Sequence, residues 1–169
     1  RENDRAVIQC NIRDITERKK AELALIRLAS IVESSDDAII GKDLNGIVNS
    51  WNTGAEKIFG YTASEMVGTP ILRLIPPSLR VEEKHILRKI KQGKGLQHFE
   101  TLRRTKSGRL INVSITSSPI KDARGQVIGA SKVARDISAR KLAEEMLRRN
   151  EALFSALIEQ APIGVYVVD

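Results

Sequence analysis

The stretch VIGASKVARDISARK, residues 127–141, joins a β-strand pattern directly to a helix signal. Its first part predicts a strand over about 126–135, and Asp136 then precedes a charged helical run. An aspartate at this position can accept hydrogen bonds from the first amides of the helix, and its carboxylate can reach Arg140 four residues later. The stretch therefore predicts a strand that ends in a capped helix, with an ion pair between Asp136 and Arg140.

Nearly the same junction occurs near the beginning of the sequence. NIRDITERKKAE at 11–22 matches VARDISARKLAE at 133–144, with Asp14 in the position of Asp136 and Thr16 in the position of Ser138. Self-similarity at a fixed spacing is typical of tandem arrays. We therefore expect the end of one structural unit to precede a complete unit.

A second internal similarity predicts the start of a further unit. IVESSDDAIIGKD at 31–43 is similar to LIEQAPIGVYVVD at 157–169. The similarities together predict five segments in the chain. These are the last strand of a preceding unit at 1–16, a connector helix at 17–35, a complete domain at 36–138, a second connector helix at 139–160 and the first strand of a following unit at 161–169.

The complete unit has the pattern of an α+β domain. Two short strands are expected around a turn at 43–46, and Thr62 and Glu65 have the spacing of a capping box in the helical region that follows. Either Asn52 or Thr53 can cap the first short helix. A longer helix over 79–92 is then followed by three strands, at about 97–104, 109–119 and 126–135.

The composition excludes several classes of function. The sequence is 41% hydrophobic and 29% charged, has one cysteine, and lacks the roughly 20 consecutive apolar residues of a membrane-spanning helix. We therefore expect a soluble cytoplasmic protein without direct membrane insertion. The net charge is +7, but aromatic residues make up only 4%, which argues against nucleic-acid binding. The basic residues are interpreted as solvated, including those of one predicted hairpin: Arg103, Arg104, Lys106 and Arg109.

No catalytic pattern is present in the sequence. It contains no glycine-rich phosphate loop, no nucleophile paired with a base, and no cluster with the spacing of metal ligands. We therefore expect that this chain is not itself an enzyme.

Several motifs together resemble the PAS domain, a sensory module of bacterial signalling proteins. They are GIVNSWN (46–52), AEKIFGYTASEMVG (55–68), LIPP (74–77), FETLRRTKSGR (99–109) and VIGASKVARDISARK (127–141). The resemblance implies a five-stranded antiparallel sheet of order 2-1-5-4-3 with short helices over one face. It also implies a sensory module of a histidine kinase or a diguanylate cyclase, with neighbouring PAS units and a catalytic output domain elsewhere in the parent protein.

The resemblance also implies two sets of functional residues. PAS domains enclose a small molecule between sheet and helices, or pair with another PAS domain, and then pass strain into the helix that leaves the last strand. The expected transmission residues are Asp14, Thr16, Asp136, Ile137, Ser138 and Arg140; the alternative is that they are ordinary helix caps without a signalling role. The expected pocket residues, which would otherwise be simple core, are Trp51, Phe59, Ile71, Leu74, Ile86, Ile90, Phe99, Val113, Ile115 and Ser131.

Some members of this family bind flavin covalently or bind haem, and the sequence argues against both cofactors here. Covalent flavin chemistry needs a cysteine in the region 69–80, which contains none. Haem-binding members use a histidine whose position falls near Glu83 here, whereas the histidine of this helix is His85. Two residues rotate a helix by about 200°, onto the opposite face. No cofactor is therefore predicted, and a non-covalent small ligand remains open.

The two connector helices carry apolar stripes of heptad spacing. In the second, Ala143, Asn150 and Leu157 occupy one heptad position and Met146 and Leu153 the other. A parallel coiled coil between two copies would use Met146, Asn150, Leu153 and Leu157, which predicts a homodimer. Alternatively, each helix packs back on its own sheet. The module could also be a ligand-free spacer that only dimerises.

Overall fold

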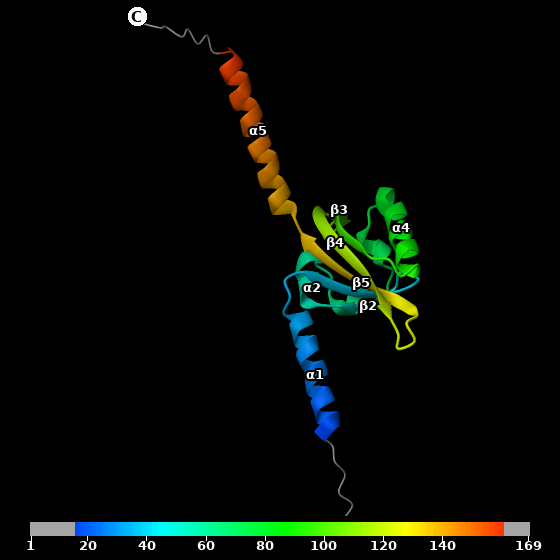
Figure 1. The fold of residues 1–169 in the computed structure, drawn as a ribbon. Coiled ribbons are helices and arrows are strands. Elements are labelled where there is room, and N and C mark those ends of the chain that lie inside the picture. Colours follow the sequence, from blue (N-terminus) through cyan, green and yellow to red (C-terminus); the bar gives the residue numbers. More distant parts are fainter. Residues whose placement is uncertain (1–15, 161–169) are drawn as a thin grey trace, which may run out of the picture.

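The computed structural model describes residues 16–160, and a five-stranded antiparallel sheet forms its centre (Figure 1). The spatial order is β2-β1-β5-β4-β3, which confirms the order that the resemblance implied. The strands are β1 (Ala38–Asp43), β2 (Val48–Trp51), β3 (Leu96–Arg104), β4 (Leu110–Lys121) and β5 (Val127–Asp136). The first and last strands of the domain are therefore neighbours, with β1 paired along β5.

Helical segments connect β2 to β3 and lie over one face of the sheet. They are α2 (Thr53–Phe59), α3 (Ala63–Met66), two 3₁₀ turns at Ile71–Leu74 and Pro77–Leu79, and α4 (Arg80–Lys91). On β4 the residues Ile111, Val113 and Ile115 are buried beneath them, while the residues between are half-buried. This alternation gives the sheet one covered and one more open face.

Local capping explains where the short helices begin and end. The Oδ1 atom of Asn52 accepts a hydrogen bond of 2.9 Å from the Ala55 amide, so Asn52 rather than Thr53 caps α2. Gly60 ends this helix with φ at +76°, a conformation that favours glycine. The Thr62 amide donates to the Glu65 carboxylate at 3.0 Å, as the predicted capping box requires.

Two long helices, α1 (Thr16–Glu33) and α5 (Ser138–Gln160), project from opposite ends of the domain (Figure 1). No residue of α1 is buried. Its last turn is nevertheless bonded to the domain, because Asn52 donates to the Val32 carbonyl at 2.9 Å and Glu33 accepts from the Thr53 amide at 3.0 Å. Within the described residues, no helix combines the length and apolarity needed to cross a membrane.

Candidate functional site

The junction between β5 and α5 is held by hydrogen bonds to β4. The Asp136 carboxylate accepts from the Ser138 amide at 2.8 Å, which confirms the predicted cap. The Ser138 hydroxyl in turn accepts from the Asn112 amide at 3.0 Å, and the buried Ile137 donates its amide to the Asn112 carbonyl at 2.9 Å. The start of α5 is therefore hydrogen-bonded to strand β4.

The predicted ion pair between Asp136 and Arg140 is wrong. Arg140 instead pairs with Glu100 of β3 at 2.5 Å and with Glu144 of α5 at 2.8 Å. Lys141 also pairs with Glu100, at 2.6 Å. The Asp136 carboxylate is engaged by the helix amide, whereas Glu100 lies within reach of both cations and has a pKa lowered by hydrogen bonds from Lys141 and Arg140. The base of α5 is thus connected to β3 as well as β4.

Of the corresponding residues at the first junction, the structure describes Thr16. Thr16 is the first residue of α1 and is exposed. Asp14 lies outside the described residues. At the exit helix, the Ser138 amide donates to Asp136, and Arg140 pairs with Glu100 of β3.

Apart from Ser131, the predicted pocket residues lie in or against two apolar clusters under the helices. Ile86 and Ile90 of α4 form the second cluster with Ala130, and Phe99 packs against it. Ser131 lies on the opposite face, because it alternates with the buried Ala130 and Lys132 along β5. The first cluster contains Trp51, Phe59, Ile71, Leu74, Val113 and Ile115.

Between these apolar clusters lie charged side chains, which we call the polar layer: Lys42, Glu83, Arg103 and Lys132. All four residues are at most 2% exposed. On β1, Lys42 is the next inward residue after Ile40 of the first cluster. On β5, Lys132 lies between Ala130 of the second cluster and Ala134 of the first. The Glu83 carboxylate bridges both lysines: one oxygen accepts from Lys42, and the other from Lys132 at 3.0 Å.

The electrostatics of the polar layer follow from its burial. Burial raises the pKa of Glu83, but the charges of Lys132 and Lys42 outweigh it and lower the pKa to about 2. Burial and the charge of Lys42 lower the pKa of Lys132 to about 7, against the attraction of Glu83. Glu83 is therefore held in its charged form, and the pKa of Lys132 lies well below that of an ordinary lysine.

Arg103 completes the polar layer from β3. Its Nη1 donates to the Leu102 carbonyl at 2.6 Å, to Thr101 at 3.2 Å and to the Glu82 carboxylate at 3.4 Å. Nη2 is buried without a hydrogen-bond partner in the described part of the chain. The sequence interpretation that all hairpin cations are solvated is therefore wrong for Arg103, which points to the covered side of the sheet.

Sequence reasoning missed the polar layer, although a signal for it was present. In β1, Ala38, Ile40 and Lys42 share one face by alternation, and Glu83 lies three and seven residues before Ile86 and Ile90 on the apolar stripe of α4. Charged residues at inward positions on two elements indicate a buried ion pair.

The histidines do not contribute to this interior. His85 is exposed on α4, on the other side of the helix from the buried Glu83. His98 is exposed on β3 and lies beside Ser114 and Thr116. Among residues 16–160 no group of three or more histidine, cysteine or acidic side chains is placed to hold a metal ion.

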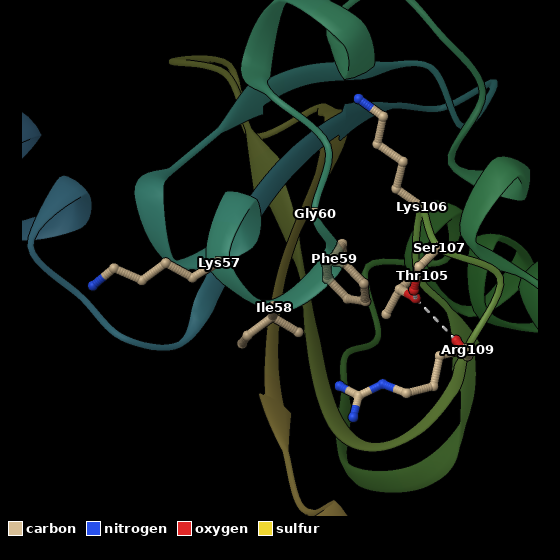
Figure 2. A pocket seen from close by; sticks show the side chains of 8 residues that line it. All are labelled: Lys57, Ile58, Phe59, Gly60, Thr105, Lys106, Ser107 and Arg109. Atoms are coloured by element: carbon tan, nitrogen blue, oxygen red, sulfur yellow. Dashed lines mark hydrogen bonds between the residues drawn. The ribbon is translucent and has the colours of Figure 1, made fainter.

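A surface cleft of about 420 Å³ lies between α2 and the β3–β4 hairpin (Figure 2). Its cations do not converge, because the side chains of Lys57, Lys106 and Arg109 extend in different directions (Figure 2). Lys57 pairs with Asp36 at 3.2 Å, and Lys106 with Glu65 at 2.6 Å. This cleft therefore lacks the convergent polar groups that the buried layer has.

Comparisons with known proteins identify relatives of this architecture. A family model described as the PAS fold matches residues 26–137. The crystal structure of a PAS domain from Colwellia psychrerythraea superimposes with a TM-score of 0.63 at 26% identity, covering 69% of this chain and 98% of that one.

Two curated proteins are similar in sequence. The signal transduction histidine-protein kinase AtoS of Escherichia coli K12 is 30% identical over 123 residues, which are 73% of this chain and 20% of AtoS. A phytochrome of Picea abies is 24% identical over 165 residues, which are 93% of this chain and 14% of the phytochrome. The chain thus spans a fifth or less of the length of these relatives.

Proposed function

Because this chain belongs to the PAS family, we propose that it is a regulatory module of a larger cytoplasmic signalling protein. In this proposal the module responds to a small ligand or a partner and transmits its state through α5. The observation that carries the proposal is the junction, where bonds from β3 and β4 converge on the first turn of a helix that otherwise leaves the domain. A change in the position of β3 or β4 would therefore move the base of α5.

We further propose that the parent protein is a histidine kinase or a diguanylate cyclase, with its catalytic domain outside this chain. The similarity to the kinase AtoS supports the first of these. The proposal includes neither haem nor covalent flavin, since His85 is exposed and residues 69–80 contain no cysteine. It also includes no nucleic-acid partner.

The connector helices are the proposed dimer contact, with a second copy of the chain as the partner. Met146 and Leu153 are 57% and 64% exposed, and Leu147 and Phe154 are exposed beside them. Asn150 is exposed on the same helix, and the side chain of Leu157 lies outside the described part. A parallel pairing of two α5 helices would cover this stripe and place the two Asn150 residues opposite each other.

A single substitution tests the dimer contact. We expect Leu153→Asp to weaken self-association by about tenfold or more, because it places two carboxylates in an apolar seam. Sedimentation velocity over a range of concentrations measures the effect. Ser155→Asp is the matched control, since it adds the same charge at an exposed position outside the stripe. An unchanged mass for Leu153→Asp, or equal weakening by both variants, would argue against this contact.

A second candidate function is a ligand-free spacer that only dimerises. The observation that favours it is the pairing of Glu83 with both Lys42 and Lys132, which satisfies part of the buried charge internally. A spacer would need no coupling between the interior and the junction. The two candidates therefore differ in whether the sheet and α5 respond to each other.

A further inference from the structure

The polar layer carries more positive charge than its carboxylates balance. Lys42, Lys132 and Arg103 are cations, and their acidic partners are Glu83 and the neighbouring Glu82. An unbalanced charge inside a protein is unfavourable, and a buried ionisable group commonly becomes neutral instead of keeping it. A lysine does so by losing a proton, whereas an arginine stays charged. The excess of one cation therefore indicates a lysine that gives up its proton readily.

The surroundings of Lys132 favour its neutral form. Glu83 from α4 accepts a hydrogen bond from its amine at 3.0 Å and attracts its charge, whereas Lys42 from β1 and Arg103 from β3 repel it. Its neighbour on β4 is Ser117, which is uncharged. Lys132 is 2% exposed, so water hardly screens these charges. Burial and the two cations together lower the pKa of Lys132 to about 7.

We propose that the polar layer is a proton-binding site, and that the charge of Lys132 is the signal that this module passes to α5. This inference rests on the proposed function, because it names the signal of the same regulatory module. When Lys132 is neutral, the two remaining cations face two carboxylates and the charges balance. When Lys132 is protonated, the layer holds one positive charge in excess. The proton comes from solvent and returns to it, and no bond between heavy atoms forms or breaks.

Glu83 provides a route between solvent and Lys132. A cleft of about 440 Å³ lies between α4 and the turn that follows β1, and Glu83 lines it together with Gly46 and Lys84. One oxygen of the Glu83 carboxylate accepts the hydrogen bond from Lys132. A proton can therefore pass from the cleft to the amine through Glu83, without an opening that reaches Lys132 itself.

Protonation changes how β5 is held. With Lys132 charged, its contact with Glu83 is an ion pair, whereas a neutral amine makes a weaker hydrogen bond to the same carboxylate. Strand β5 ends at Asp136, whose carboxylate accepts from the Ser138 amide at the start of α5. Strand β4 pairs with β5 beside Lys132 and bonds to the same start of α5 through Asn112. The strands next to the titrating amine are therefore two of those that hold the exit helix.

Carbon-13 NMR of the lysine Cε atoms in the purified chain tests the proposal. We expect the Lys132 signal, assigned through its bonds to the backbone of β5, to titrate with a midpoint of about 7, whereas exposed lysines titrate at about 10.4. Lys132→Met should remove this titration, because methionine is uncharged and of similar length. Lys57→Met is the matched control at the surface and should leave the titration unchanged.

A Lys132 midpoint of about 9 or above, close to that of exposed lysines, would overturn the proposal. A titration near pH 7 that persists in Lys132→Met would overturn its assignment to this residue. If Lys132→Met does not fold, the assigned wild-type signal still decides the question. Glu83→Gln then serves as the second variant, because loss of the one attracting charge should lower the Lys132 midpoint further. An unchanged midpoint in Glu83→Gln would contradict the proposed site.

The pH dependence of stability gives a second readout. The pKa of Lys132 is about 7 in the folded protein and 10.5 ordinarily, so between these values the unfolded chain binds more protons. Stability from this group therefore rises as the pH rises above about 7, by up to about tenfold in the folding equilibrium constant per pH unit. Chemical denaturation between about pH 7 and 9 should show this rise in the wild type and not in Lys132→Met. Equal pH dependence in the two proteins would contradict the proposal.

Hydrogen exchange at residues 141–147 shows whether the proton signal reaches α5. After correction for the intrinsic effect of pH on exchange, we expect the protection of these amides to change several-fold between about pH 6 and 8 in the wild type, and not in Lys132→Met. Equal protection at both pH values would overturn proton sensing even if Lys132 titrates as expected. That failure differs from a failure of the proposed function, because Glu100→Gln tests the junction without any titration of Lys132.

Discussion

Replacing Glu83 with alanine should lower the free energy of unfolding by about 3–5 kcal/mol at neutral pH, because it leaves Lys42 and Lys132 buried without their shared counter-ion. Chemical denaturation of the purified chain measures this loss. Asp36→Ala is the control: it removes the partner of Lys57 at the surface, where an ion pair contributes about 1 kcal/mol or less. Similar losses for the two variants would contradict a buried role for Glu83.

The same substitution should alter the acid limb of the stability profile. The pKa of Glu83 is about 2 in the folded protein and 4.5 ordinarily, so between these values the unfolded chain binds more protons. Stability from this group is therefore complete above pH 4.5 and is lost as the pH falls toward 2. Glu83→Ala should remove that part of the slope. If the variant keeps the wild-type slope, other carboxyl groups cause that slope.

Replacing Asn52 with alanine should cost about 2–4 kcal/mol, the second largest expected effect. The buried amide accepts from the backbone of Ile39 at 2.8 Å and of Ala55 at 2.9 Å, and it donates to Val32 and Asp37 at 2.9 and 3.1 Å. Alanine would remove an N-cap and leave the Ile39 amide without this acceptor. It would also remove one of the bonds between α1 and the domain.

Asn49→Ala is the matched control for this substitution, because Asn49 is an exposed residue of the adjacent strand β2. Its cost should stay within about 0.5 kcal/mol. Hydrogen exchange at the last turn of α1 provides the second readout, and we expect faster exchange in Asn52→Ala only. Equal stability for the two variants would show that the buried amide is not what joins α1 to the domain.

Local patterns predicted the elements well, because each is determined by neighbouring residues. The capping box at Thr62 depends on residues three positions apart, and the structure confirms it. The sheet order came from the resemblance to the PAS family, since pairing β1 with β5 joins residues far apart in the sequence.

The polar layer was not predicted because its members are distant from one another in sequence. Lys42 and Glu83 are 41 positions apart, and each alone has the appearance of a solvated charge. The spacing of four residues predicts an ion pair between Arg140 and Asp136. It cannot reveal that Glu100 of β3 lies beside the helix and pairs with Arg140 instead. Ser131 was placed in the pocket although the inward position of β5 belongs to Lys132. In each case the partner is supplied by the tertiary fold.

The most direct test of the account measures the coupling between the sheet and α5. Hydrogen exchange should be followed at the amides of residues 141–147 in the wild type and in Glu100→Gln, which removes the partner of both Arg140 and Lys141. Glu144→Gln is the control, because it affects only a pair within the helix. We expect exchange at these amides to accelerate several-fold in Glu100→Gln, to change less in Glu144→Gln, and to remain unchanged in β4 and β5. Identical exchange in Glu100→Gln and the wild type would contradict the claim that this junction connects the sheet to the exit helix.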